Sequence, residues 1–323
     1  MQGRSCLRAL AIAACMAGAS ADQVLAQAYP ARPIRLVVPW APGGSIDFLG
    51  RLVAQKLTER AGLSVFVENR AGAGTNLGAE YVARAAADGY TLLMASSTQA
   101  INVSLYPKLS YDVMKELVAV SPVANNPSVL VVHPSLPVKT VPELLALARV
   151  RPGELLYASS GSGSTSHLAG ELLKMSARID LVHVPYKGAG PALAELLGGH
   201  VQMMITVLAQ TLPHVRAGKL RALAVTSKAR LSSAPELPTM QEAGVKGYEV
   251  NVWSGILAPA ATPRDIVAML NAETGKAVKE LAGRLAELGA EPLYATPEEF
   301  SRFIRAEIAK WAVVVKRSGA RVD

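Results

Sequence analysis

Two turns rich in glycine and hydroxyl residues are the part of this sequence best suited to bind a ligand. Pro42-Gly43-Gly44-Ser45 and Gly161-Ser162-Gly163-Ser164-Thr165 each follow a short apolar run and precede a helical pattern. A helix N-terminus exposes N–H groups without partners and carries a partial positive charge, so each turn favours an anion. Two such turns in separate halves of the chain predict a cleft that closes on a carboxylate.

The first turn supports two interpretations. Its successive glycines, Gly43 and Gly44, let a ligand approach the backbone closely because neither carries a Cβ atom. Ser45 ends the turn, a helix is predicted over 46–60, and Asp47 falls in its first turn, where a carboxylate also caps N–H groups. The segment is therefore either one half of an anion site or an ordinary strand-to-helix turn capped by Asp47.

The second turn offers several hydroxyls beside backbone N–H groups. Gly163, Ser164 and Thr165 form a set that can bond carboxylate oxygens without placing a full charge in the site. A flexible linker is the alternative, but a strand and a helix flank the segment directly. His167, on the helix that follows, is expected to make a structural hydrogen bond more readily than a ligand contact.

A third candidate lies at the end of another strand, in Val184-Pro185-Tyr186-Lys187-Gly188. Ligands of open α/β sheets bind outside the carboxyl ends of the strands, which places Tyr186 and Lys187 favourably. Tyr186 can donate its hydroxyl, whereas Lys187 is equally consistent with solvated surface.

Patterns typical of catalysis or cofactor binding are missing from the sequence. Gly72 to Gly78 reads G-x-G-x-x-x-G, which differs from the dinucleotide-binding motif, and no acidic residue ends the next strand to hold a ribose. These glycines are therefore expected to form a wall of the cleft or to turn the chain. No nucleophile elbow follows Tyr29, and the 5 histidines lack metal-ligand spacing. We therefore expect no catalytic residue, no metal and no cofactor.

The N-terminal segment predicts export. Arg4 and Arg8 precede an uncharged run over 9–21, and Ala26-Gln27-Ala28 has the small-x-small pattern of a signal-peptide cleavage site. Residues 1–28 are therefore predicted to be a cleaved signal peptide, with the protein in the periplasm. Lipoprotein cleavage at Cys15 is the less favoured alternative, because Cys15 follows Arg8 too closely.

Composition narrows the class of ligand. The net charge is +8 at pH 7, but no basic run interleaved with aromatic residues occurs, so the sequence favours an anionic small molecule over nucleic acid. Both cysteines, Cys6 and Cys15, lie in the predicted signal peptide, so the exported chain needs no disulfide. The uncharged stretch over 117–138 is interrupted by proline and asparagine, which favours a strand over a membrane helix.

Short β-branched runs alternate with amphipathic runs from residue 34 to 94 and again after residue 140, which predicts parallel sheets covered by helices. Apolar runs near 119–132 and 250–257 bracket the middle block. The fold class is α/β, with residues 29–127 plus 251–323 as domain I and 128–250 as domain II. The two runs are expected to be crossing strands that hinge the domains, with the ligand cleft between them.

These segments together resemble the Bug-type extracytoplasmic solute receptors, the periplasmic components associated with tripartite tricarboxylate transporters. The resemblance covers nearly the whole exported chain and rests on seven motifs in order: 34–39 with Pro42-Gly43-Gly44 and Asp47, 67–70 with 72–78, 88–93, 163–171, 184–188, 196–199 and 223–227. It implies a type II-like periplasmic-binding-protein fold of two domains around a hinged cleft.

The resemblance also implies a set of ligand-binding residues. Trp40 stands where the family usually has a smaller aromatic residue, and is expected to narrow the cleft mouth. Gln202 replaces a common acidic residue, a change expected to relax or reverse selectivity for a ligand amino group. The residues carried over as candidates are Gly43, Gly44, Ser45, Asp47, Gly163, Ser164, Thr165 and Tyr186, with Ser97 and Asn126 as weaker ones.

The function expected from the sequence is that of a non-enzymatic, monomeric receptor. It captures a small carboxylated metabolite by domain closure and presents it to membrane permease subunits. One alternative is an accessory that delivers its ligand to a membrane sensor kinase. A less favoured one is an exported α/β enzyme, which would need a nucleophile, a metal set or a cofactor loop.

Overall fold

The computed structural model describes residues 29–231 and 233–321. The predicted signal peptide, together with the alternative cleavage at Cys15, lies outside these residues. A compact unit begins at Arg32 and contains every helix and strand discussed below. Within the described ranges, no helix combines the length and the apolar character needed to cross a membrane.

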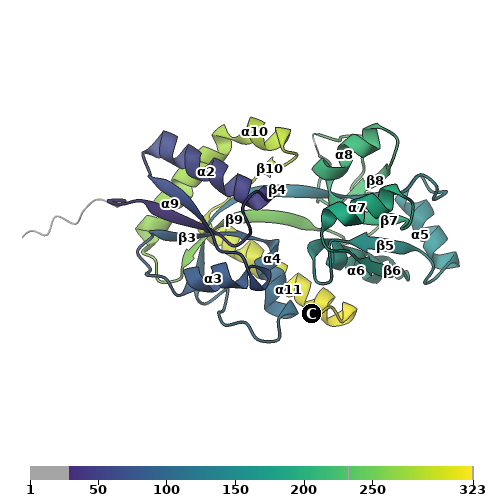
Figure 1. Ribbon diagram of the computed structural model, residues 1–323, viewed down its shortest axis with the longest axis horizontal. Helices are drawn as coiled ribbons and strands as arrows, with labels where there is room; N and C mark the ends of the chain where they lie inside the picture. Colours follow the sequence, from purple (N-terminus) through teal and green to yellow (C-terminus); the bar gives the residue numbers. More distant parts are fainter. Residues whose placement is uncertain (1–28, 232, 322–323) are drawn as a thin grey trace, which may run out of the picture. The chain divides into compact units, whose positions relative to one another are not determined.

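The first half of the unit is built on three parallel strands in the order β2-β1-β3, of which β3 is labelled in Figure 1. Four of the five residues of β1 are buried, as expected for a strand covered on both faces. The strands are β1 (Ile34–Val38), β2 (Val65–Asn69) and β3 (Thr91–Ser96). The helical segments between and after them are α2 (Ser45–Ala61), η1 (Ala73–Thr75), α3 (Asn76–Ala83) and α4 (Ser97–Leu105).

The second half repeats this arrangement. Strand β5 pairs in parallel with both β6 and β7, and each of the three is followed by a helix. The strands are β5 (Leu156–Ser159), β6 (Val182–Pro185) and β7 (Met203–Val207). The helices are α5 (Val141–Val150), α6 (Thr165–Ala177), α7 (Ala189–Leu197) and α8 (Leu208–Arg216).

Two long strands join the halves. Strands β4 (Leu117–Val132) and β9 (Asn251–Pro259) pair antiparallel with each other, β9 also pairs with β3, and β4 also pairs with β7. The sheet order is therefore β2-β1-β3-β9-β4-β7-β5-β6, with β8 (Arg221–Val225) and β10 (Glu291–Pro292) pairing with β4 off this path. The predicted crossing strands and the α/β class are confirmed. The predicted boundary at 127 and 128 falls inside β4, and the domain division stays a prediction.

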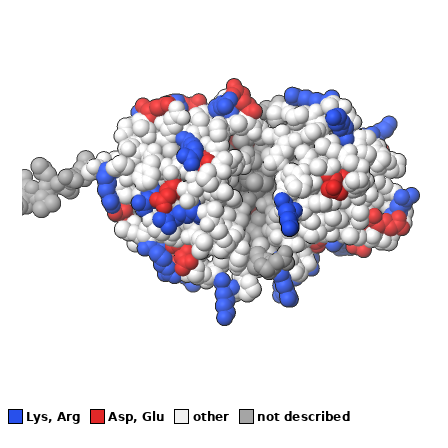
Figure 2. All heavy atoms as spheres, in the orientation of Figure 1, with Lys and Arg blue, Asp and Glu red and all other residues white. Residues whose placement is uncertain are grey.

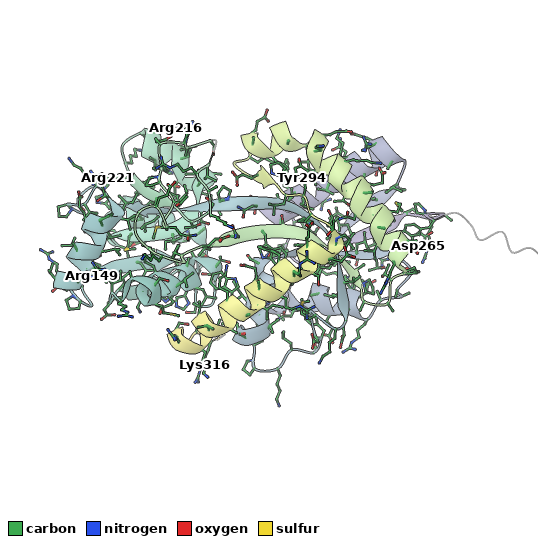
Figure 3. All side chains as sticks on the ribbon, turned by 180° about the vertical axis from the view of Figure 1, so that it is seen from behind. Arg149, Arg216, Arg221, Asp265, Tyr294 and Lys316 are labelled. Carbon is green, nitrogen blue, oxygen red and sulfur yellow. The ribbon has the colours of Figure 1, made fainter. Side chains whose placement is uncertain are left out.

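The C-terminal helices return to the first half, as predicted. They are α9 (Arg264–Glu280), α10 (Ala282–Glu287) and α11 (Pro297–Ser318). Helix α9 packs against α2 and β4, and α11 packs against α4 and β4. A Thr296 capping box and Pro297 begin α11, and Gly319 in the left-handed region ends it. Seen from behind, α11 lies across the sheet (Figure 3).

Three helices were not predicted. Helices α4 and α8 are short and rich in polar residues, and α8 contains Pro213, a residue that a helix interior disfavours. Helix α10 follows α9 after a single residue, and the sequence reads as one helix over 264–281. Two of the missed helices, α4 and α8, begin at the cavity described next.

Candidate ligand-binding site

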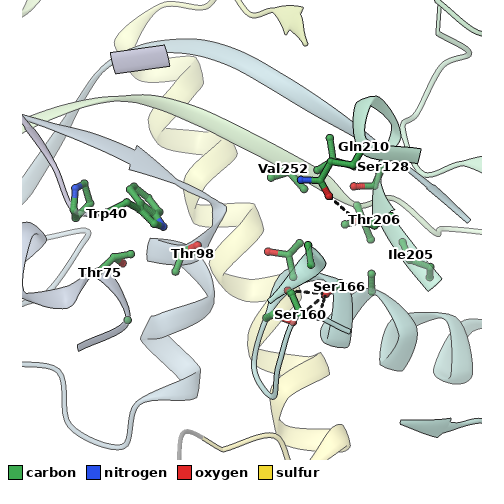
Figure 4. Close-up of a pocket in the computed structure, with 18 of the residues that line it drawn as sticks. Trp40, Thr75, Thr98, Ser128, Ser160, Ser166, Ile205, Thr206, Gln210 and Val252 are labelled. Carbon is green, nitrogen blue, oxygen red and sulfur yellow. Dashed lines mark hydrogen bonds between the residues drawn. The ribbon is translucent and has the colours of Figure 1, made fainter. Parts of the chain in front are cut away.

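A cavity of about 520 Å³ lies between the two halves (Figure 4). Its walls come from loops and helix starts that follow the sheet strands of both halves. From the first half and β9 it is lined by Pro39, Trp40, Ala41, Ala71, Gly72, Gly74, Thr75, Thr98, Val250 and Val252, and from β4 and the second half by Ser128, Ser160, Ser164, Thr165, Ser166, Ala169, Ala189, Ile205, Thr206, Val207 and Gln210.

The lining is polar without being charged. It contains 8 serine or threonine residues and Gln210, and it contains no Lys, Arg, Asp or Glu within the described part of the chain. On the face in Figure 2, Lys and Arg are interspersed with Asp and Glu over the surface and do not gather into one basic patch. An anion in the cavity would therefore be held by hydroxyls and backbone dipoles, and no ion pair with a lining side chain would form.

Those backbone dipoles come from four helix starts. Strands β3, β5, β6 and β7 end at the cavity, and the helices that follow them, α4, α6, α7 and α8, each place a residue of their first turn in its lining: Thr98, Thr165, Ala189 and Gln210. Each helix start carries a partial positive charge and N–H groups without helical acceptors. Their convergence makes the cavity favourable for an anion.

The start of α6 is pre-organised by its own side chains. The Ser164 hydroxyl donates to the carbonyl oxygen of Gly161 at 2.6 Å and accepts from the N–H of His167 at 3.3 Å. His167 Nδ1 accepts from the Gly163 N–H at 3.0 Å. Ser164 is thus the N-cap of α6. The N–H groups of Thr165 and Ser166 lie ahead of the first possible helical acceptor, which leaves them available to a ligand.

The turn before α2 is fixed by Asp47. One oxygen of this buried carboxylate accepts from the Gly43 N–H at 2.9 Å, and the other accepts from Asn69 Nδ2 at 2.8 Å. Arg51 pairs with the same carboxylate at 3.0 Å, and Asn69 also donates to the carbonyl oxygen of Trp40 at 3.1 Å. Both Asp47 oxygens are engaged within the protein, so Asp47 lies beneath the turn and shapes it.

We expect Asp47→Asn to destabilise the fold by about 1.5–3 kcal/mol, the usual value of hydrogen bonds to a charged group. Burial raises the pKa of Asp47, but hydrogen bonds from Arg51, Gly43 and Asn69 outweigh it and lower the pKa. The stabilisation of the fold by the ionised Asp47 carboxylate is therefore complete above about pH 4. It is lost as the pH falls through the lowered pKa. Urea unfolding measures the loss.

Asp265→Asn is the matched control for Asp47→Asn, because Asp265 also lies in the first turn of a helix but is exposed. An equal loss of stability in both variants would contradict the role assigned to the Asp47 network.

The glycine-rich loop after β2 forms a strained wall of the cavity. Ala73 and Thr75 have φ angles of +46° and +82°, which a β-branched residue such as Thr75 rarely adopts. Gln99 Nε2 donates to the Thr75 hydroxyl at 2.7 Å, and Asn102 Nδ2 donates to the carbonyl oxygen of Gly74 at 2.8 Å. Two buried amides of α4 therefore hold the strained turn, and Gly72 and Gly74 line the cavity as the sequence suggested.

The structure separates the predicted site residues into three groups. Trp40, Ser164 and Thr165 line the main cavity. Four others line a smaller cavity of about 260 Å³, together with Phe48 and Leu49 of α2, Leu285 of α10 and two residues that follow α10: Gly43, Gly44, Ser45 and Asn126. The lining of neither cavity contains Asp47, Ser97, Gly163 or Tyr186.

Besides Asp47, the third group contains three residues that pack against other parts of the protein. Ser97 is fully buried, and its hydroxyl has no hydrogen-bond partner among the described residues. Gly163 adopts a φ of +76° and faces Leu105 so closely that a Cβ atom would lie 2.5 Å from Leu105 Cδ2. Tyr186 packs against the apolar cluster of the second half, which includes Ala192 and Leu196.

Gln202 does not face the cavity, contrary to the expectation that it affects ligand selectivity. Its Oε1 accepts from the backbone N–H of Leu156 at 2.8 Å, at the start of β5. The Gln202 side chain therefore accepts a hydrogen bond at the N-terminal end of β5. The helix starts lie at the opposite, C-terminal ends of the strands. Gln202 directly precedes β7, at the end of the strand opposite α8, and the lining of the main cavity does not contain it.

Sequence reasoning missed Thr75, Thr98, Ser128, Thr206 and Gln210 as lining residues. Thr206 and Gln210 are linked by a hydrogen bond of 3.4 Å and lie on the second-half side of the cavity (Figure 4). The sequence did contain one indication of these residues. Thr98 and Gln210 each follow an apolar strand closely, and ligands of α/β sheets bind at the carboxyl ends of the strands. The failure to predict α4 and α8 hid it.

A stacked histidine pair supports the second turn from behind. The rings of His167 and His183 lie 3.8 Å apart, and His183 Nε2 is 2.6 Å from the Ser159 hydroxyl. Burial, with the neighbouring His167 and Lys174, lowers the pKa of His183 to about 4, and burial also lowers the pKa of His167. Both rings are therefore neutral in the folded protein at pH 7.

The histidine pair predicts acid sensitivity. An unfolded histidine has a pKa of about 6.5, so unfolding takes up protons as the pH falls from 6.5 towards 4, and stability declines over that window by roughly 1–3 kcal/mol. We expect His183→Asn to flatten this decline in urea unfolding measured from pH 7 to pH 4. His214→Asn, which lies outside the pair, should retain it, and an unchanged slope in His183→Asn would contradict the assignment.

A cavity between two α/β halves joined by crossing strands, with helix starts around it, is the architecture of a solute-binding receptor. Residues 49–320 match the family described as tripartite tricarboxylate transporter family receptor, which is well over half of the chain. The chain belongs to this family, whose receptors are periplasmic. The resemblance seen in the sequence is confirmed.

Individual relatives agree with this assignment. Protein BugT of Bordetella pertussis is 41% identical over 306 residues, covering 94% of both chains. The structure of R. palustris Rpa4515 with adipate is 40% identical, covers 91% of this chain and all of that one, and superposes with a TM-score of 0.76. MatC (Rpa3494) from Rhodopseudomonas palustris with bound malate is 34% identical, covers 89% of this chain and all of that one, and has a TM-score of 0.73.

Proposed function

We propose that this receptor binds a small aliphatic dicarboxylate in the main cavity. The observation that carries the proposal is the convergence of four helix starts, α4, α6, α7 and α8, on a cavity with no charged lining residue in the described ranges. Such a cavity stabilises negative charge through N–H groups and hydroxyls. The adipate and malate in the two structures reported above support the ligand class.

The lining also suits the carbon chain of such a ligand. Ile205, Val207, Val250 and Val252 contribute apolar surface beside the hydroxyl groups, and Trp40 adds an aromatic side chain. Ligand sites usually combine apolar walls with a few converging polar groups that fix orientation. We infer that one carboxylate lies at the start of α6, near Thr165 and Ser166, and that Thr206 and Gln210 orient the remainder of the ligand.

Domain closure follows from the distribution of these groups. Thr75 and Thr98 belong to the first half, whereas Thr165, Ser166 and Thr206 belong to the second. A ligand shifts an equilibrium only by binding one arrangement of the halves more tightly than another. A dicarboxylate that contacts both halves favours the closed arrangement, and closure creates the surface that membrane permease subunits recognise.

The proposal includes export and the absence of catalysis. The signal peptide is cleaved after Ala28, and the exported chain acts as a monomeric receptor without enzymatic activity. Mass spectrometry of the periplasmic protein tests the cleavage site. An N-terminus at Cys15 carrying lipid would instead support the lipoprotein alternative.

A thermal-shift screen tests the ligand class. Linear dicarboxylates of increasing length, malate, citrate, amino acids and monocarboxylates are added at equal concentration. A ligand at one hundred times its Kd stabilises the folded state by about 2.7 kcal/mol, which is several degrees in melting temperature. We expect the largest shift with a dicarboxylate. A larger shift with an amino acid or a neutral solute would contradict the proposal.

A further inference from the structure

A second cavity lies on the opposite face of the crossing strands. It has a volume of about 310 Å³ and is enclosed by β4, β9, the segment before α11, and α11 itself. Residues of β9 and the segment before it alternate between the two cavities: Val250 and Val252 line the main cavity, whereas Glu249, Asn251 and Trp253 line this one. The strand ribbon therefore separates two cavities, one on each face.

Aromatic residues form much of the second cavity. Trp253 and Phe300 are almost fully buried and meet edge to face with ring centroids 5.5 Å apart, and Phe303 meets Trp253 at 5.9 Å. Tyr294, labelled in Figure 3, lines the same cavity and is 49% exposed. Aromatic faces attract cations, most strongly where water is excluded.

The charged residues of this cavity are both acidic. They are Glu249 and Glu299, and no Lys or Arg is among its described lining residues. Hydrogen bonds from Thr296 lower the pKa of Glu299, so Glu299 is ionised at neutral pH. The main cavity lacks formal charge, whereas this one combines aromatic rings with carboxylates. The two cavities therefore favour ligands of opposite charge.

Two buried polar atoms of this cavity's wall lack partners. Asn125 and Trp253 lie opposite each other in the pairing of β4 with β9, which places their side chains on the same face of the sheet. Trp253 Nε1 and Asn125 Oδ1 are buried and have no hydrogen-bond partner among the described residues. A buried donor or acceptor without a partner costs about 1–3 kcal/mol, so a ligand or water that satisfies both would be stabilised.

From these observations we infer that the cavity between the crossing strands and α11 is a second ligand site, which takes a small amphipathic amine. The ammonium group lies against the carboxylates and aromatic rings, an apolar body fills the space beside Phe303, and a hydroxyl or carbonyl of the ligand accepts from Trp253 Nε1. This inference does not depend on the identity of the dicarboxylate.

Calorimetric titration with 2-amino-1-phenylethanol tests the inference, since this probe carries an amine, a hydroxyl and an aromatic ring. We expect saturable binding, at least tenfold weaker binding of 1-phenylethanol, which lacks the amine, and no binding of phenylacetate. Glu249→Gln combined with Glu299→Gln should weaken the amine at least tenfold. Glutamine at 299 retains the capping box of α11, so this variant is expected to fold.

Two further measurements complete the test. Amine binding should persist in Gly44→Val and in the presence of saturating dicarboxylate, whereas competition between the two ligands would place the amine in the main cavity and overturn the inference. Dicarboxylate affinity should be unchanged in the double glutamine variant, which separates this inference from the proposed function. Absence of amine binding to the unaltered protein, or equal binding by the double variant, would also overturn it.

Discussion

Gly44→Val is expected to reduce dicarboxylate affinity at least a hundredfold while leaving the fold intact. Gly44 is the N-cap of α2, has extended backbone with φ −78°, and is exposed. A Cβ atom there would meet nothing closer than the carbonyl oxygen of Ala41 at 3.9 Å. A branched side chain is therefore tolerated by the protein, but it covers the N–H groups at the start of α2. Gly44 lines the smaller cavity of about 260 Å³, and we infer that domain closure brings the start of α2 to the dicarboxylate in the main cavity. A hundredfold loss corresponds to about 2.7 kcal/mol.

Calorimetry on folded Gly44→Val measures this loss. Gly283→Val is the matched control, because a Cβ atom at Gly283 also meets nothing within 4 Å and Gly283 lines neither the main cavity nor the smaller one. We expect the control to bind like the unaltered protein. Full affinity in Gly44→Val would remove the first turn from the site.

Thr165→Val is expected to weaken dicarboxylate binding about ten- to a hundredfold. Ser164 uses its hydroxyl for the cap of α6, whereas the Thr165 side chain lines the cavity at the same helix start. Valine keeps the shape of threonine and removes the hydroxyl. A lost hydrogen bond to a charged group costs about 1.5–3 kcal/mol, which gives this range of affinity.

Thr165→Ser is the control for this position, since it retains the hydroxyl and should bind within about threefold of the unaltered protein. Calorimetric titration compares the three proteins under one buffer condition. If Thr165→Val binds as tightly as Thr165→Ser, the Thr165 hydroxyl makes no contact with the carboxylate, and the second turn acts only through its backbone.

Much of the fold was predictable from the sequence because its strands and long helices follow simple periods. Strand β1 is an unbroken apolar run, and α11 combines Thr296, Pro297 and a terminal Gly319 with a regular apolar face. The crossing strand β4 was recognisable from its uncharged length interrupted by Pro122 and Pro127, a pattern that favours a strand over a membrane helix. These features are local, so one sequence suffices to reveal them.

The candidate site was less predictable because it depends on contacts between distant segments. Asp47 occupies the capping position that the sequence allowed, but only the structure places Arg51 and Asn69 around it. The strained φ of Thr75 is supported by Gln99 from α4, a residue 24 positions away. Thr206 entered the lining from the end of β7, and Gln210 from α8, a short helix that contains Pro213. No local pattern encodes such pairings.

The central claim is that helix starts and hydroxyls, and no charged side chain, hold a dicarboxylate in the main cavity. The most direct test is calorimetric titration of the protein with adipate and with adipamide, its neutral diamide of nearly equal shape. Saturable binding of one adipate per chain, with adipamide at least a hundredfold weaker, is the predicted result, since only the carboxylates gain from the helix dipoles. Equal affinity for adipate and adipamide would contradict the claim.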